Sequence, residues 1–214
     1  MMAESGGRPR RAGLGAPQLT LAGSAAGAVV LAVLAAGGFD PLEKPETDIA
    51  PLAAGETVDL GPFELTVDRL RVVDELPGIS EGDDDTRVLA LVATVEATGT
   101  ATEYGALLSG SVALDGVPGV TADGDGSEPV PADAVHVMAD GTRLDAVQPG
   151  LEYEVALVWE QDARADVPAE ARLVLVGRTL RESSIDHTQE WLDPLPVAAG
   201  DLEVTAPPPS EDES

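Results

Sequence analysis

The chain has 214 residues and a net charge of −27, because thirty-nine acidic residues outnumber twelve basic ones. A field of this sign repels phosphate backbones, which excludes nucleic acid as a partner. The chain contains no cysteine and is 43% hydrophobic but only 3% aromatic. Its core must therefore be built from aliphatic side chains, without disulfides.

Residues 1–18 are polar and predict a short disordered arm. Residues 19–39 follow without a single charge, and as a helix they would span about 30 Å, the thickness of a hydrocarbon core. Three arginines within residues 8–11 precede this segment, whereas only Lys44 lies close behind it. The positive-inside rule therefore predicts one N-terminal transmembrane helix with a cytoplasmic N-terminus.

A cleaved secretory signal is the alternative interpretation of the same segment. It shares the basic start and apolar core, and small residues around Ala35 and Gly37 offer cleavage sites. Both interpretations place residues 40–214 outside the membrane. We therefore predict a single-pass protein of the cell membrane whose C-terminal domain is extracytoplasmic, with cleavage left open.

Residues 40–54 contain three prolines and predict an extended stalk, whereas residues 205–214 predict a disordered acidic tail. Between them, residues 55–204 have the length of one domain. This domain holds thirty-one acidic residues and eight arginines, which gives it a charge of −23. We expect the acidity to favour solubility and cationic partners over anionic ones.

Hydrophobic alternation with a period of two predicts strands throughout this domain. The clearest strand is Leu151–Glu160, and a phase change near Asp68 in the strand that starts at Phe63 predicts either a β-bulge or a strand break. Asp115 and Gly116 predict a tight hairpin between two short strands. The other predicted strands are Arg87–Ala97, Ser111–Leu114, Val117–Val120, Ala134–Met138, 172–176 and Val197–Val204. Short strands separated by Gly, Pro and Asp turns predict an all-β sandwich.

Three segments resemble a known class of domain. The sequence GETVDLGPFELTV at residues 55–67, ATGT at 97–100 and VQPGLEY at 147–153 are similar to immunoglobulin-like domains of membrane-anchored proteins and lipoproteins of Gram-positive bacteria. The resemblance implies an immunoglobulin-like sandwich of about seven to nine strands in an extracytoplasmic location. The chain departs from the class in lacking a lipid-modified cysteine and in carrying the segment 178–204. The resemblance supplies no catalytic residues.

Asp123 and Asp125 resemble part of a calcium loop. With Gly126 at position 6 of an EF-hand they occupy positions 3 and 5, but position 12, which needs a bidentate glutamate, is Ala132. Asp and Gly are also the usual residues of turns. We therefore predict no cofactor and no metal site, and keep Ca²⁺ at these two aspartates as the alternative.

Arg178, Arg181, His187 and Trp191 gather in one segment of an otherwise acidic, aromatic-poor domain. Trp and Arg are frequent anchors of protein interfaces, and loops often carry function. These four residues are therefore our interaction candidates. The alternative is structural: Trp191 closes one end of the sandwich and the arginines pair with nearby acids.

No catalytic motif accompanies these residues. Ser183, Asp186 and His187 are sequence neighbours, whereas a catalytic triad converges from separate elements. We predict that the protein is not an enzyme but a non-enzymatic interaction or accessory module of the cell envelope, which binds the membrane through its helix and another envelope protein through its domain. The alternative is a secreted or anchored hydrolase or cation-dependent enzyme that uses surface carboxylates. The sequence leaves the oligomeric state open.

Overall fold

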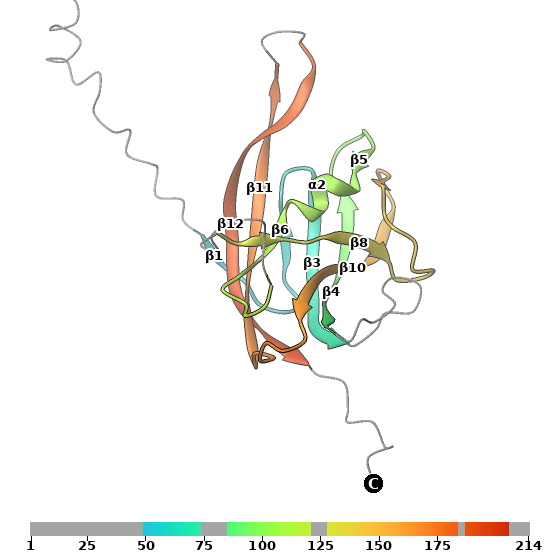
Figure 1. Cartoon of the computed structure of the whole chain (residues 1–214). Helices are drawn as coiled ribbons and strands as arrows, with labels where there is room; N and C mark the ends of the chain where they lie inside the picture. The colour runs from blue at the N-terminus through green and yellow to red at the C-terminus, as the bar shows by residue number, and fades with distance from the viewer. Residues whose placement is uncertain (1–48, 74–84, 121–127, 184–186, 206–214) are drawn as a thin grey trace, which may run out of the picture. The chain divides into compact units, whose positions relative to one another are not determined.

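The computed structural model describes residues 49–73, 85–120, 128–183 and 187–205, which all belong to the compact unit Thr47–Ser214. Within these ranges the chain forms twelve strands and one short helix, α2 (Figure 1). The elements are β1 Ala50–Pro51, β2 Thr57–Asp59, β3 Phe63–Val73, β4 Thr86–Ala97, β5 Glu103–Tyr104, α2 Gly105–Ser109, β6 Val112–Asp115, β7 Val130–Pro131, β8 Ala134–Val137, β9 Ala146–Val147, β10 Glu152–Asp162, β11 Glu170–Glu182 and β12 Gln189–Thr205.

The strands pair in the order β7-β6-β11-β12-β3-β4-β10-β8, and β1 and β2 add to β12 and β3. Most neighbours are antiparallel, but β12 lies parallel to β1 and to β3. β12 runs beside β11 for most of its length and reaches β3 only at Val204 and Thr205. It therefore connects the layer of β7, β6 and β11 to the layer of β3, β4, β10 and β8.

Aliphatic side chains from both layers form the main core, and a second small buried cluster consists of Val88, Ala90, Ala156 and Val158. Leu91 and Leu157 come from one layer and Leu173 and Leu175 from the other, and all four are fully buried. Trp159 is buried among them, and its indole Nε1 donates a hydrogen bond to the carbonyl oxygen of Val130 at 2.9 Å. The fold is thus an all-β sandwich stabilised by apolar burial, as the alternation predicts.

Two details of the sequence pattern are confirmed. The predicted strand Leu151–Glu160 corresponds to β10, which pairs with β4 along eleven residues and with β8 on its other edge. The phase change near Asp68 is a β-bulge, because the register between β3 and β4 shifts between Val67 and Arg69. The twelve strands exceed the expected seven to nine because four of them have only two residues each.

One other expectation is wrong. Val117–Val120 is a turn, because β6 pairs with β7 and β11 instead of folding back on this segment. Val117 and Val120 are nevertheless buried, so core packing explains their apolar character. The pairing of Ala50–Pro51 with β12 places the start of the sheet inside the segment 40–54 that we expected to be a stalk.

The predicted membrane segment 19–39 lies outside the described residues. Within the described ranges, no helix is long and apolar enough to cross a bilayer.

Candidate functional site: the β-arm and an acidic cleft

The longest strands, β11 and β12, continue past the sandwich as a two-stranded ribbon (Figure 1). We call residues 177–182 and 189–196 the arm. β6 pairs with β11 only up to Leu175, and β1 pairs with β12 only at Ala198 and Ala199. Among the described residues, the arm strands therefore pair only with each other, from Gly177–Leu195 to Glu182–Gln189. The segment that we expected to be a loop is an extension of two strands.

Trp191 holds the base of the arm against the sandwich. Its indole Nε1 donates a hydrogen bond to Oε1 of Glu103 at 3.0 Å, and its ring lies against the backbone of Gly61. Gly61 has a φ of 91°, and a Cβ at this position would overlap the carbonyl oxygen of Arg178. The absence of a side chain at Gly61 is thus what allows this close approach.

Arg178 fixes the same base from the other strand. Its guanidinium donates hydrogen bonds to Oγ of Ser111 and to the carbonyl oxygen of Gly110, and its backbone N–H donates to the carbonyl oxygen of Leu60 at 2.8 Å. Burial lowers the pKa of Arg178 from its usual value. This group nevertheless remains protonated at neutral pH, since an arginine pKa lies far above 7.

Arg181 and His187 lie further out and pair within the arm and its tip. Nε of Arg181 is 2.9 Å from Oδ2 of Asp193, and Nδ1 of His187 is 2.6 Å from Oε1 of Glu182. Both pairs are exposed, so each contributes at most about 1 kcal/mol. The four interaction candidates therefore lie on the arm or at its tip. Arg178 and Trp191 contact the sandwich, whereas Arg181 and His187 pair with acidic side chains of the arm itself.

Three leucines on the arm are exposed, a feature that the sequence pattern did not reveal. Leu180, Leu192 and Leu195 keep 44%, 39% and 47% of their surface accessible. Large apolar side chains of this kind usually lie in a core, as Leu173 and Leu175 do on the same strand β11. The arm thus presents apolar surface away from the core of the described domain.

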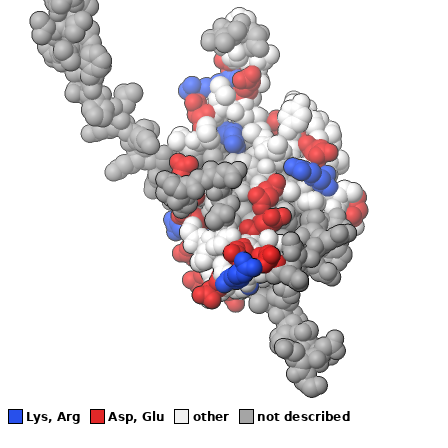
Figure 2. Space-filling model, in the orientation of Figure 1, with Lys and Arg blue, Asp and Glu red and all other residues white. Residues whose placement is uncertain are grey.

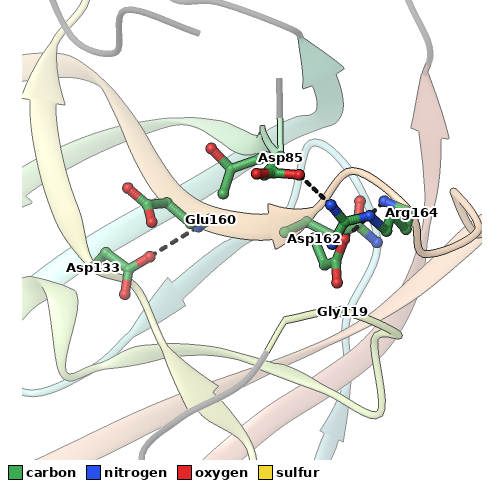
Figure 3. A pocket seen from close by; sticks show the side chains of 8 residues that line it. Asp85, Gly119, Asp133, Glu160, Asp162 and Arg164 are labelled. Atoms are coloured by element: carbon green, nitrogen blue, oxygen red, sulfur yellow. Dashed lines mark hydrogen bonds and ion pairs between the residues drawn. The ribbon is translucent and has the colours of Figure 1, made fainter. Parts of the chain in front are cut away.

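An acidic cleft of about 640 Å³ lies elsewhere on the domain (Figure 3). Its carboxylates come from four positions, Asp85, Asp133, Glu160 and Asp162, and Arg164 lies among them. Arg164 pairs with Asp85, its backbone N–H donates to Oδ1 of Asp162 at 2.8 Å, and Asp133 accepts from the backbone N–H of Glu160 at 2.9 Å. Three of these four carboxylates thus fix the local backbone or pair with the chain's own cation.

The buried side chain that lines the cleft, Gln161, is also hydrogen-bonded within the protein. Gln161 is fully buried, accepts a hydrogen bond from Nε of Arg87 at 2.8 Å and donates one to the carbonyl oxygen of Pro118 at 2.6 Å. Within the described ranges, no three carboxylate or imidazole side chains converge in a way that would hold a metal ion. Asp123 and Asp125 lie outside the described residues. The cleft lies where the start of β4 and the end of β10 meet the turn at Gly119.

Comparison with known proteins adds one structure. No protein-family model and no curated protein matches the chain. Among solved structures, the chain is similar to an uncharacterized β-sandwich protein from Clostridium difficile 630, with 12% identity, a TM-score of 0.47, and coverage of 76% of this chain and 100% of that one. The sandwich therefore rests on the strand pairing of this chain itself.

Proposed function

We propose that this chain is a non-enzymatic interaction module of the cell envelope, with an immunoglobulin-like sandwich held outside the membrane by residues 19–39. The observation that carries the proposal is the arm. It extends two strands beyond the core and presents three exposed leucines on a ribbon that is anchored at its base. Neighbouring exposed apolar side chains, such as Leu192 and Leu195, are typical of protein contact sites.

The anchoring of the arm supports a binding role over a structural one. A ribbon that only closed the end of the sandwich would need no residues beyond Trp191 and Arg178, which make its contacts with the domain. The arm instead continues past Trp191 by two residue pairs to Glu182 and Gln189, and it also leaves Leu192 and Leu195 exposed on the core side of Trp191. Because the arm is already held in one orientation, less conformational entropy is lost when a partner binds.

Photo-crosslinking in intact cells tests this function. A photoreactive residue placed at Leu192 of the full chain should give discrete adducts with another envelope protein, because the arm lies at the contact. The matched control places the same residue at Val167, which is also exposed but lies outside the arm. Adducts from Val167 alone, or none from any arm position, would reject the arm as the interaction element.

A further inference from the structure

Leu192 and Leu195 lie on one face of the arm. Leu192 stands opposite Thr179 and Leu195 opposite Gly177; these two partners are two residues apart on β11, and the extra residue of β12 lies at the register shift between the pairs. Side chains two residues apart on a strand point to the same face, and cross-strand partners share that face. The two leucines thus face neighbours too small to cover them.

The opposite face of the arm carries Trp191, which contacts the sandwich. Leu180 pairs across the strands with Trp191, which packs against Gly61 and bonds to Glu103. Since successive residues alternate between faces, Leu192 points away from the side that Trp191 occupies. The face of Leu192 and Leu195 therefore carries two of the three exposed leucines of the arm and lies on the side that Trp191 does not occupy.

A row of carboxylates lies at the same end of the sandwich as the base of the arm. We call Asp59, Glu64, Glu96 and Glu152 the carboxylate row, because they stand directly opposite one another across β2, β3, β4 and β10. All four are exposed, and none takes part in an ion pair among the described residues. Like charges placed directly opposite each other destabilise a sheet. The row begins two residues before Gly61, on which Trp191 packs.

The net charge of the chain favours one kind of partner for this face over the others. A second copy of the chain also carries −27, and the two copies repel each other. An anionic lipid surface is repelled for the same reason. The positive charges of Arg178 and Arg181 are already included in this net charge, and Arg181 is paired with Asp193 within the arm. Figure 2 shows acidic side chains spread over the face in view, with fewer basic ones between them.

We propose that the face of Leu192 and Leu195 docks a partner protein whose contact surface is apolar at its centre and rich in lysine and arginine at its edge. This inference rests on the proposed function and names the chemistry of the partner. The leucines supply apolar contact area, and the exposed carboxylate row at the same end of the sandwich attracts the basic edge.

Panning of displayed random peptides against the purified full chain tests this chemistry. We expect the enriched peptides to combine aliphatic or aromatic residues with lysine or arginine. A synthetic copy should bind the Leu192→Ser/Leu195→Ser variant at least about ten-fold more weakly, because two leucine contacts are lost. The matched control is Leu151→Ser, which alters a leucine that is 52% exposed outside the arm and should leave binding unchanged.

The carboxylate row has its own variant. Replacing Glu64, Glu96 and Glu152 by glutamine should weaken binding and flatten its dependence on salt, since exposed charges are screened by ions. Melting curves of each variant check that the sandwich remains folded.

Several results would overturn the inference. The first is that the enriched peptides lack basic residues. The second is that panning against the double leucine variant enriches the same peptides equally well. The third is a dimer in sedimentation that the double leucine variant abolishes. Arm adducts in cells together with any of these results would reject the partner chemistry and keep the proposed function, whereas missing adducts would reject that function itself.

Discussion

Replacing Gly61 by alanine measures how tightly the arm is seated on the sandwich. The added Cβ would overlap the carbonyl oxygen of Arg178 and lie 3.0 Å from a ring carbon of Trp191. The φ of 91° adds a second cost, because residues with a Cβ rarely adopt it. Alanine at this position must therefore strain its own backbone and push the base of the arm away.

The two costs are separable in magnitude. A left-handed backbone costs a residue with a Cβ about 1–2 kcal/mol, and forcing extra atoms into a packed contact costs about 1–3 kcal/mol. Gly61→Ala should thus lose about 2–5 kcal/mol, which corresponds to about 4–20 °C in Tm for a chain of this size. Gly55 has a φ of 84° with nothing within 4 Å of its Cβ position, so Gly55→Ala bears only the first cost.

Thermal unfolding of the full chain, followed by circular dichroism, compares the two variants. We expect Gly61→Ala to melt below Gly55→Ala by about 2–12 °C, the share of the packing cost alone. Equal melting temperatures would refute the reasoning, because they would mean that the arm moves aside without loss. The contacts of Trp191 and Arg178 would then contribute little to its orientation.

Three further perturbations have definite expected outcomes. Glu96→Lys places a cation between two carboxylates of the row and should stabilise the fold by about 0.5–2 kcal/mol, which raises Tm by about 1–8 °C. The gain should shrink in high salt. An unchanged Tm at low salt would contradict the repulsion between the carboxylates of the row. Leu157→Ala removes a fully buried side chain and should cost about 2–5 kcal/mol in chemical denaturation, and a loss below about 1 kcal/mol would contradict the core. Hydrogen bonds from the hydroxyl and backbone of Thr142 lower the pKa of Asp140, so the stability they add is present above the unfolded pKa and lost as the pH falls through the folded one. Thr142→Val should therefore move the carboxyl titration of Asp140, followed by NMR, to higher pH, and an unmoved midpoint would contradict the bond.

The parts of the fold that bury one face on the core were readable from the sequence. Val155, Leu157 and Trp159 of β10 face the main core at every second position. Its other face is buried in the middle, where Ala156 and Val158 belong to a second, smaller cluster. The bulge at Asp68 was readable for the same reason, since the apolar residues change phase where the strand gains a residue. Local pattern and burial agree in these strands.

The arm was not readable in this way. Between Arg178 and Pro196 most residues are exposed on both faces, so no alternation marks them as strands. Pro194 and Asp193 suggest a loop, and in the structure they coincide with register shifts between β11 and β12. The pairing of these strands is dictated by the ladder that begins in the core and continues outward.

The carboxylate row and the cleft depend on register and could not be derived from spacing. Glu64, Glu96 and Glu152 become neighbours only through the alignment of three strands. The failure at Val117–Val120 has the same origin, because β6 pairs with β7 and with β11, whose residues lie at least 57 positions away in sequence, as in the pair Asp115–Arg172. Long-range pairing overrode a strong local turn signal at Asp115 and Gly116.

A single cysteine gives the most direct test of the central claim that the arm is covered by a partner outside the membrane, because the chain has no cysteine of its own. The measurement is the rate at which a membrane-impermeant maleimide labels Leu192→Cys in intact cells and in the purified chain, with Leu151→Cys as the control. We predict that both positions label without lysis, and that only position 192 labels more slowly in cells than after purification. Labelling that requires lysis, or equal protection at both positions, would contradict the claim.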